Sequence, residues 1–319
     1  MISREQFNKK QIVYCFSSSG DKIQIQNENV AIVNKGETRL KTSCYRLFAI
    51  YIIGECSITM RVIKLAHKFG FAIVFMTSSF KLIDIIGLKM EGNTVLRQKQ
   101  YGYNGYEIGK FFVENKIANQ ITTVKFIREQ SEHRSRTIKE LKKYNHLLKE
   151  STESIPSIMG IEGICAKLYF NEIFYDIGWD GRKPRIKRDY INSALDIGYT
   201  ILFNHIETIL RIYGFDIYKG FLHKQFYMRK SLVCDFMEPF RCIIDRQLRK
   251  SIHLRQIKKE DFKKIDSRYV LKWECNKKYV RIYTNCINEY KEEIFLFIQS
   301  FYRSFTKGKP VVAYDMFNL

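Results

Sequence analysis

Short apolar runs separated by turn residues fill the first ninety residues of the chain. Four of them have the length and β-branched content of strands, with Asn, Gly or Ser between them: QIVYCF (11–16), KIQIQNENVAIV (22–33), FAIVFMT (71–77) and KLIDIIGLKM (81–90). Between the strands, SITMRVIKLAHKFG (57–70) repeats apolar residues at helical spacing, with Ser57 as the expected N-cap and Gly70 as the expected end. The pattern predicts a small β-rich domain, similar to a β-sandwich, with one embedded helix.

From about residue 95 the apolar residues recur at intervals of three and four. Three segments are helical over most of their length: TVLRQKQYGYNGYEIGKFFVENKIANQITTVKFIREQ (94–130), SRTIKELKKYNHLLKE (135–150) and DYINSALDIGYTILFNHIETILRIYG (189–214). Strand signals are sparse there, apart from KKYVRIYT near residues 277–284. We therefore expect an α+β protein, with a β-rich domain over residues 1–94 and a mainly α-helical domain over residues 95–319.

The chain is strongly basic, with a formal net charge of +21 at pH 7. Residues 1–94 carry 13 Lys and Arg against 7 Asp and Glu, a net of +6, which leaves +15 for residues 95–319. The excess therefore runs along the whole chain, and no detachable basic tail explains it. A field of this sign favours a polyanionic partner, either nucleic acid or an anionic membrane surface. Compositional drift toward lysine is the plain alternative.

The sequence also carries signals of its cellular location. The first residues, MISREQFNKK, lack the apolar core of a signal peptide, and no apolar run reaches the ~18 residues of a membrane span. The longest runs, LFAIYII (47–53) and FAIVFM (71–76), have the length of buried strands or helix faces. The eight cysteines form no CxxC pair. We therefore expect a soluble cytoplasmic protein with reduced thiols.

Four ionisable side chains stand out because they lie in apolar or basic sequence: Glu162, His223, Asp235 and Glu238. Glu162 lies in MGIEGICAKLYF, where Lys167 is the other charged residue. Its plain interpretation is a carboxylate in the first turn of a helix that begins after Gly160, facing the helix dipole.

The other three side chains have plain interpretations as well. His223 is a lone histidine at the end of YKGFLH, which suits an ordinary core or surface residue. Asp235 and Glu238 are three residues apart, so they share a face only in a helix that contains or is kinked at Pro239. Two surface carboxylates are the alternative.

Taken together, these side chains suit a divalent cation. Carboxylate oxygens are the ligands that Mg²⁺ prefers, and an imidazole shifts the preference toward Mn²⁺ or another transition ion. Zinc, which His and carboxylates also bind, is an alternative that no Cys/His cluster supports. A bound metal polarises a phosphoryl oxygen and lowers the pKa of the nucleophile, so a site of this kind in a protein of +21 fits a reaction on a nucleic-acid backbone.

Several basic stretches can contact phosphates, and GRKPRIKR (181–188) is the most specific of them. Five of its eight residues are basic, and it also contains a Gly and a Pro. This composition is typical of a loop that approaches a backbone and adds affinity with little sequence selection. Arg97 and Tyr101, in LRQKQY, can supply a phosphate contact and a stacking platform. Neither GxxxxGK[ST] nor GxGxxG occurs. The predicted DNA-binding residues are Arg97, Tyr101, Arg182, Lys183, Arg185, Lys187, Arg188 and Arg241, the last of which can pair instead with one of the acids.

Several motifs resemble the Cas-one family of CRISPR-associated adaptation integrases. The most specific block is SLVCDFMEPFR (231–241), with GYTILF and YGFDIYKGFLH upstream. Four other segments agree with it: GIEG followed by AKLYF, ECSITMRVIKLAHKFGFAIVFM, NTVLRQKQY and KIANQ. The resemblance covers about residues 20–245, and little family signature follows residue 250.

The resemblance implies an N-terminal β-domain, an α-helical catalytic domain, and homodimers bridged by a small ferredoxin-like CRISPR partner protein. The implied reaction depends on Mg²⁺ or Mn²⁺: the 3′-hydroxyl of a captured double-stranded DNA fragment attacks a phosphodiester at the edge of a CRISPR repeat. The family's metal-binding Glu, His and acidic positions correspond to Glu162, His223 and Glu238. Asp235 matches a frequent second acidic position and is assigned a supporting catalytic role.

Two other functions remain open at this point. A metal-dependent nuclease acting on branched DNA would use the same residues, with water as the nucleophile. A non-catalytic architectural DNA binder would use the basic loops alone. The acids argue against the second, because bare carboxylates repel phosphate unless a cation intervenes.

Overall fold

The computed structural model describes residues 3–17, 19–87, 92–127, 131–183 and 186–319, which form two compact units. The first unit comprises Met1–Asn93 together with Glu207–Phe215, and the second comprises Thr94–Ile206 and Asp216–Leu319. The end of one long helix therefore counts with the β-rich unit, which the apolar pattern does not indicate. Dimerisation through residues 1–94 and catalysis by residues 95–319 stay predictions.

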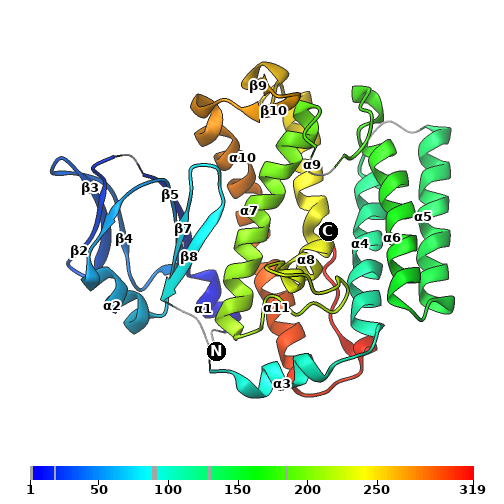
Figure 1. The fold of residues 1–319 in the computed structure, drawn as a ribbon, viewed down its shortest axis with the longest axis horizontal. Helices are drawn as coiled ribbons and strands as arrows, with labels where there is room; N and C mark the ends of the chain where they lie inside the picture. Colours follow the sequence, from blue (N-terminus) through cyan, green and yellow to red (C-terminus); the bar gives the residue numbers. More distant parts are fainter. Residues whose placement is uncertain (1–2, 18, 88–91, 128–130, 184–185) are drawn as a thin grey trace. The chain divides into compact units, whose positions relative to one another are not determined.

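Two four-stranded sheets build the first unit, one with the order β1-β5-β7-β8 and the other β4-β3-β2-β6 (Figure 1). β1, β5 and β7 run parallel, and β8 is antiparallel to β7. β2, β3 and β4 are antiparallel, and β6 runs parallel to β2. The elements are α1 Arg4–Asn8, β1 Gln11–Phe16, β2 Lys22–Gln26, β3 Asn29–Asn34, β4 Glu37–Ser43, β5 Leu47–Ile53, β6 Ser57–Ile58, α2 Met60–Phe69, β7 Ala72–Met76 and β8 Leu82–Gly87.

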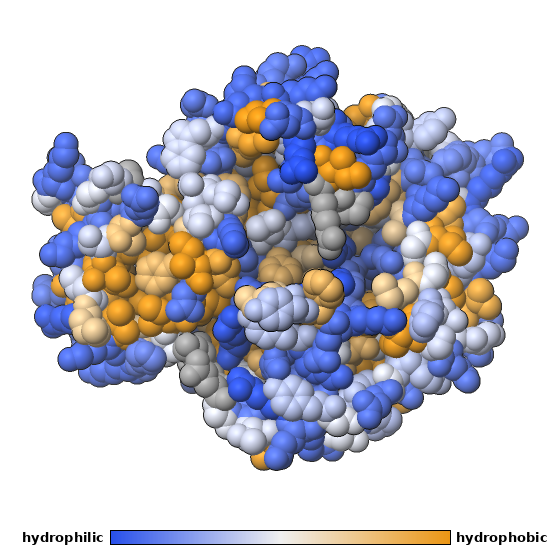
Figure 2. Space-filling view, in the orientation of Figure 1, coloured by the Kyte–Doolittle hydropathy of each residue, from blue (hydrophilic) through white to orange (hydrophobic). Residues whose placement is uncertain are grey.

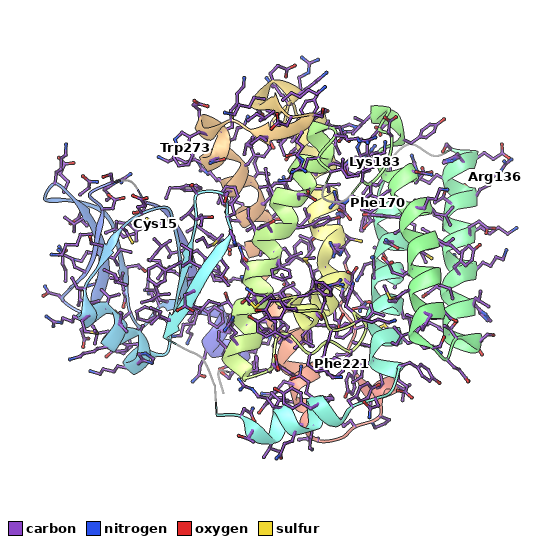
Figure 3. The ribbon with its side chains drawn as sticks, in the orientation of Figure 1. Cys15, Arg136, Phe170, Lys183, Phe221 and Trp273 are labelled. Atoms are coloured by element: carbon purple, nitrogen blue, oxygen red, sulfur yellow. The ribbon has the colours of Figure 1, made fainter. Side chains whose placement is uncertain are left out.

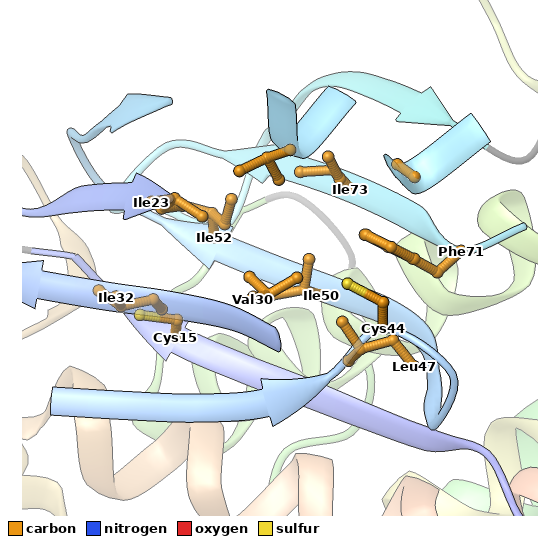
Figure 4. Packing of buried hydrophobic residues seen from close by; sticks show 12 residues of the cluster. Cys15, Ile23, Val30, Ile32, Cys44, Leu47, Ile50, Ile52, Phe71 and Ile73 are labelled. Atoms are coloured by element: carbon orange, nitrogen blue, oxygen red, sulfur yellow. The ribbon is translucent and has the colours of Figure 1, made fainter. Parts of the chain in front are cut away.

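Both sheets and α2 share one apolar core (Figure 4). Every residue of β5 is buried, because this strand lies inside its sheet with both faces covered. Ile50 and Ile52 face the core, while the Tyr51 hydroxyl, on the other face, donates to Thr208 Oγ1 at 3.2 Å. The apolar run at 47–53 is therefore a strand and not a helix face.

The predicted helix of this unit is α2, which begins later than its sequence suggests, and α1 is a second helix that the apolar pattern did not predict. Gly70 ends α2 in the left-handed conformation with a φ of 66°, as predicted. The N-cap, however, is Thr59, because Ser57 is already paired in β6 beside Lys22 of β2. The prediction of Ser57 as N-cap is wrong for that reason.

The second unit is mainly helical, and α4 lies at its centre, against α5, α6, α8 and α9. α4, α5 and α6 stand side by side in Figure 1. Phenylalanines from α4, α8 and α11 pack on one another, with Phe112, Phe236 and Phe301 in mutual ring contact. The helices are α3 Thr94–Gly102, α4 Glu107–Lys125, α5 Glu132–Ser151, α6 Ile155–Ile173, α7 Tyr190–Tyr213, α8 Ser231–Met237, α9 Arg241–His253, α10 Asn276–Glu289 and α11 Lys291–Thr306.

The predicted strand near residues 277–284 is wrong, because this segment belongs to α10. Its buried residues Tyr279, Val280, Tyr283 and Ile287 recur at helical spacing and face α9 and α11. β-branched and aromatic content alone had suggested a strand. The strands of this region are β9 Phe262–Ile265 and β10 Arg268–Leu271, which form a hairpin just before it.

The arrangement confirms the predicted fold class, a β-rich N-terminal part followed by a mainly helical part. Within the described ranges, the structure has no helix of the length and apolar character needed to cross a bilayer.

Candidate functional site

Helix α4 carries a buried lysine, Lys116, that lies between two of the predicted acids. Its Nζ contacts Glu162 on α6 and lies 2.6 Å from Oε2 of Glu238, in the 3₁₀ turn Glu238–Phe240. Burial alone would lower the pKa of Lys116, but Glu238 and Glu162 together raise it above its ordinary value. These three side chains form an acid–lysine cluster in which an ammonium group bridges two carboxylates.

Glu238 has a second cation on its other side. Arg241 donates from Nε to Oε2 and from Nη2 to Oε1, each at 3.0 Å. Burial by itself would raise the pKa of Glu238, yet Arg241 and Lys116 hold it well below its usual range. The carboxylate is therefore charged at neutral pH although it is buried.

The turn that carries Glu238 is fixed by an asparagine one helical turn along α4. Asn119 Nδ2 donates to the carbonyl oxygens of Pro239, at 3.2 Å, and Phe317, at 3.0 Å. Because Pro239 has no N–H group to donate, the chain turns as a 3₁₀ helix between α8 and α9. α4 thus positions both the lysine of the cluster and the backbone beside Glu238.

Asp235 binds the loop that carries His223 to α8. Its Oδ2 accepts hydrogen bonds from the backbone N–H groups of Phe221, at 2.6 Å, and Leu222, at 3.0 Å. Its Oδ1 accepts from the His223 N–H at 3.0 Å and lies 2.6 Å from His223 Nδ1. Figure 3 labels Phe221, the first residue of this set.

This arrangement selects one tautomer of His223. A carboxylate that accepts three backbone protons has only lone pairs to offer the imidazole, so Nδ1 carries the proton. The unprotonated Nε2 of the neutral ring is then the ligand atom, as in carboxylate–histidine–metal arrangements. Asp235 lies in α8, directly before the turn that carries Glu238, so the His223 loop is bound to the element that leads into the acid–lysine cluster.

Gly220 makes room for this arrangement. A Cβ atom at that position would lie 2.8 Å from Asp235 Oδ2 and 2.9 Å from Ser231 Cβ. Those separations are too short for any side chain, so the glycine allows the loop to approach the carboxylate closely.

Replacing Asp235 with asparagine should lower the free energy of unfolding by about 2–5 kcal/mol. One buried acceptor oxygen becomes an N–H donor, and the backbone N–H groups that it served are left without an acceptor. Each unsatisfied N–H group costs ~1–3 kcal/mol. Chemical denaturation with the linear extrapolation method measures the change. Asp180→Asn, at an exposed position, is the control and should leave stability unchanged within ~0.5 kcal/mol. Equal stability of both variants would contradict a structural role for the carboxylate.

The structure brings together Glu162 and Glu238, and separately His223 and Asp235. The described residues contain no group of three or more His, Cys, Asp or Glu side chains already placed around one metal ion. The position between Glu162 and Glu238 does accept a cation, because the ammonium of Lys116 lies there. Two carboxylates and an imidazole nitrogen are also a donor set that suits Mg²⁺ or Mn²⁺. The residues therefore fit the predicted metal, with Lys116 in contact with two of its three expected ligands.

Two of the plain interpretations of these residues are wrong. Glu162 lies in the middle of α6, which begins at Ile155 after the N-cap Ser154, so it does not face the positive end of a helix dipole. Asp235 and Glu238 are both buried and are not surface acids. They also have different partners, since one binds the His223 loop and the other binds Lys116 and Arg241.

Lys116 is a residue of the candidate site that the sequence did not single out. Its segment, KIANQ, supported the family resemblance but received no chemical role. The available signal was a lysine in a helix whose apolar residues occupy nearly every face. A lysine that is buried in this way needs a carboxylate partner. The acids that stood out in apolar sequence, Glu162, Asp235 and Glu238, were the candidates for that partner.

Several predicted DNA-binding residues have protein partners in the structure. Arg182 pairs with Asp196 at 2.5 Å, and Arg241 pairs with Glu238, one of its two expected partners. Both guanidinium groups lie over the Tyr199 ring. The Tyr101 hydroxyl, on α3, donates to Asp216 at 2.7 Å, and Arg97 acts on it electrostatically. Contacts of these four residues with DNA stay predictions.

Near the end of the 181–188 segment, Lys187 O accepts a hydrogen bond from the backbone N–H of Tyr269 in the β9–β10 hairpin, at 2.8 Å. Lys183 donates its backbone N–H to Asn192, and the Arg188 side chain is exposed. Arg185 lies outside the described residues. Figure 2 shows hydrophilic residues over this hairpin, and Figure 3 labels Lys183 near the start of α7.

A basic groove beside the hairpin extends this surface. Its lining contains one acid, Asp261, and five cations: Arg255, Lys258, Lys277, Lys278 and Arg281. Lys278 pairs with Asp261 at 2.7 Å, which leaves a clear excess of positive charge in the groove. Such a groove suits a phosphate backbone, and sequence reasoning after residue 250 did not find it.

These features agree with what comparison to known proteins finds. The model of the family described as CRISPR associated protein Cas1 matches residues 14–285, so the chain belongs to the Cas1 family. The CRISPR-associated endonuclease Cas1 1 of Archaeoglobus fulgidus is 30% identical over 273 residues, covering 77% of this chain and 79% of that protein. Its namesake in Thermodesulfovibrio yellowstonii is 26% identical over 305 residues, covering 91% of this chain and 96% of that protein.

Two solved structures share the fold at low sequence identity. A Cas1 protein from Thermotoga maritima superposes with a TM-score of 0.76 at 18% identity, covering 97% of this chain and 99% of the other. A casposase bound to an integration product has a TM-score of 0.75 at 20% identity, covering 97% and 96%. Both span the β-rich and the helical parts, so the fold extends over the whole length of each.

Proposed function

We propose that this protein is a metal-dependent DNA integrase of CRISPR adaptation, which acts on double-stranded DNA as homodimers that are bridged by a small ferredoxin-like partner protein. The 3′-hydroxyl of a captured fragment attacks a phosphodiester at the edge of a CRISPR repeat. The new P–O bond forms as the repeat's own P–O3′ bond breaks, the attacking hydroxyl loses its proton, and the departing 3′-oxygen gains one. The number of phosphodiester bonds is unchanged, so no energy-supplying cofactor is needed.

One observation carries the proposal: Glu162 and Glu238 meet at one buried cation, and Glu238 follows the helix whose Asp235 binds the His223 loop. Membership of the Cas1 family supports it. The curated relatives named endonucleases, and the fold shared with a casposase bound to an integration product, point the same way.

The residues of this chain have separate tasks in the proposed reaction. Arg241 keeps Glu238 charged, and Asp235 orients His223 with Nε2 unprotonated. Glu162, Glu238 and that Nε2 would hold Mg²⁺ or Mn²⁺, which polarises the phosphoryl oxygen and lowers the pKa of the attacking hydroxyl. The basic groove and the 181–188 loop bind the phosphate backbone, which orients the DNA without selecting its sequence.

Joining of a labelled fragment to a repeat-bearing plasmid, with the small partner present, tests this function. We expect joined product with Mg²⁺ or Mn²⁺ and none after chelation, because the acids would then face the phosphate without the divalent ion. Cleavage of branched DNA without joined product would instead favour a nuclease that uses water as nucleophile. DNA binding with neither reaction would leave an architectural binder.

A further inference from the structure

Helix α9 carries a buried acid, Asp245, that has no task in the proposed reaction. It follows Arg241 by four residues and is 1% exposed. Two buried phenols from other helices bind it: the Tyr199 hydroxyl on α7 donates to Oδ1, and the Tyr169 hydroxyl on α6 donates to Oδ2 at 3.0 Å. A carboxylate that is buried among neutral donors is costly to keep charged, which is a reason to look for its role.

The Tyr199 ring connects this acid to the candidate site. The guanidinium of Arg241 lies over the ring, 4.8 Å from its centroid, and that of Arg182 lies 5.4 Å from it. The face of an aromatic ring is negative and attracts a cation. A phenol that donates to a carboxylate is polarised further in that sense. Asp245 therefore fixes the ring and strengthens its attraction for both arginines.

Arg241 is thus bound on two sides. Its Nε and Nη2 donate to Glu238, while the Tyr199 ring lies against its guanidinium plane. A guanidinium that depends on Glu238 alone competes strongly with a divalent ion for that carboxylate. Negative charge on its other side weakens this competition, because the same positive charge is then balanced by two acids.

Asp245 is ionised at neutral pH. Burial raises its pKa to about 6, and hydrogen bonds from Tyr199 and Tyr169, together with the charges of Arg241 and Arg182, oppose a larger rise. The groups that face Asp245 come from five parts of the chain: Tyr169 on α6, Tyr199 on α7, Arg241 and Cys242 on α9, Tyr283 on α10, and Arg182 before α7. Burial raises the pKa of the cysteine to about 12 and those of the three tyrosines above their ordinary values, and arginines stay charged. Within this set, Asp245 is the group that titrates between pH 5 and 8.

We propose that Asp245 is a positioning residue of the metal site: through Tyr199 it shares the positive charge of Arg241 with Glu238, so that Glu238 stays available to the divalent ion. The inference rests on the proposed function, because it requires the ion at Glu238. It extends the site from α4, α6 and the Glu238 turn to α7 and the far side of α9. The role depends on the charge of the Asp245 carboxylate and not on its shape.

Binding of Mn²⁺ to the purified protein at neutral pH tests the inference, with the free ion measured by its paramagnetic resonance signal. Asp245→Asn keeps the shape of the side chain and removes its charge. It should weaken the Mn²⁺ affinity by about 10-fold, the lower end of the usual effect of residues that support metal ligands. Tyr199→Phe keeps the ring but loses the hydrogen bond to Asp245, so it should weaken the affinity by a smaller factor.

Tyr169→Phe is the matched control. It removes the other phenol from the same carboxylate, while both guanidinium groups stay over Tyr199. Thermal unfolding should show similar losses of stability for the two tyrosine variants. The Mn²⁺ affinity should stay unchanged in Tyr169→Phe and fall in Tyr199→Phe, a difference that a purely structural role would not produce.

The pH dependence separates charge from packing. As the pH falls through about 6, Asp245 of the wild type takes up a proton and comes to resemble the neutral asparagine. The ratio of the wild-type to the Asp245→Asn affinity should therefore fall from about 10 at neutral pH toward about 1 near pH 5. This ratio cancels the titration of His223, which both proteins share.

Two results would overturn the inference. One is equal Mn²⁺ affinity of folded wild-type and Asp245→Asn proteins. The other is a weaker affinity whose ratio to the wild type does not change with pH, which would assign the effect to packing.

Glu238→Gln separates the inference from the proposed function. If that variant binds Mn²⁺ as tightly as the wild type, Glu238 is not a ligand and the proposed metal site fails. Melting temperatures of the metal-free proteins then still test the pairing of both acids with Arg241. The Asp245→Asn, Glu238→Gln double variant should lose more than the sum of the two single losses, because the buried guanidinium is left without either acid. Additive losses would contradict a shared partner, whatever the metal does.

Discussion

Replacing Glu238 with glutamine should lower the rate of strand joining about 1000-fold, which corresponds to about 4 kcal/mol of lost transition-state stabilisation. The amide keeps the shape of the side chain but removes its negative charge, which Lys116 and Arg241 stabilise in the carboxylate. A metal ligand would be lost, and two cations would face a neutral group. The joining assay with a labelled fragment measures the rate.

The matched control for this variant is Glu114→Gln, on α4. Glu114 pairs with Lys149 at 2.8 Å and has no part in the acid–lysine cluster. It should keep joining activity within about threefold, since surface ion pairs contribute little. Thermal unfolding of both proteins checks that they are folded. A folded Glu238→Gln protein that joins DNA at the wild-type rate would place the reaction elsewhere.

Replacing Lys116 with methionine should destabilise the metal-free protein by about 3–5 kcal/mol, the usual effect of removing one partner of a buried ion pair. Glu162 and Glu238 would then face each other without the ammonium between them. A divalent cation can take its place, so Mg²⁺ or Mn²⁺ should raise the melting temperature of the variant by more than that of the wild type.

Differential scanning calorimetry with and without each metal measures this difference. Lys125→Met, at an exposed position near the end of the same helix, is the control and should respond to metal as the wild type does. An equal metal response in the Lys116 variant and the wild type would mean that the ammonium and the metal do not share a site. That result would count against Glu162 and Glu238 as joint ligands.

The fold class could be predicted from the sequence because it depends on local patterns, and local patterns also singled out four candidate site residues. Alternating apolar runs distinguished the strands of the first unit, and the helical period distinguished α4, α5 and α7. Glu162, His223, Asp235 and Glu238 stood out because each is an ionisable residue in apolar or basic surroundings. The family resemblance then connected residues that are far apart along the chain.

What could not be predicted depends on contacts between distant segments. Nothing near Lys116 in sequence indicates that it bridges an acid 46 positions later and another acid, Glu238, just before Pro239. Asp235 and Glu238 are close in sequence but point to different partners, which spacing alone does not reveal. In the 277–284 segment, residue composition favoured a strand, and packing against α9 made it a helix.

A single carboxylate, Asp235, binds the backbone of residues 221–223 and the ring of His223, and so holds this loop against α8. Local opening of that short helix would release His223 from its fixed orientation. The proposed metal site would then lose its imidazole while Lys116 and Glu162 stay in place on the long helices α4 and α6. Metal affinity should therefore depend on the local stability of α8 as well as on the global stability of the fold.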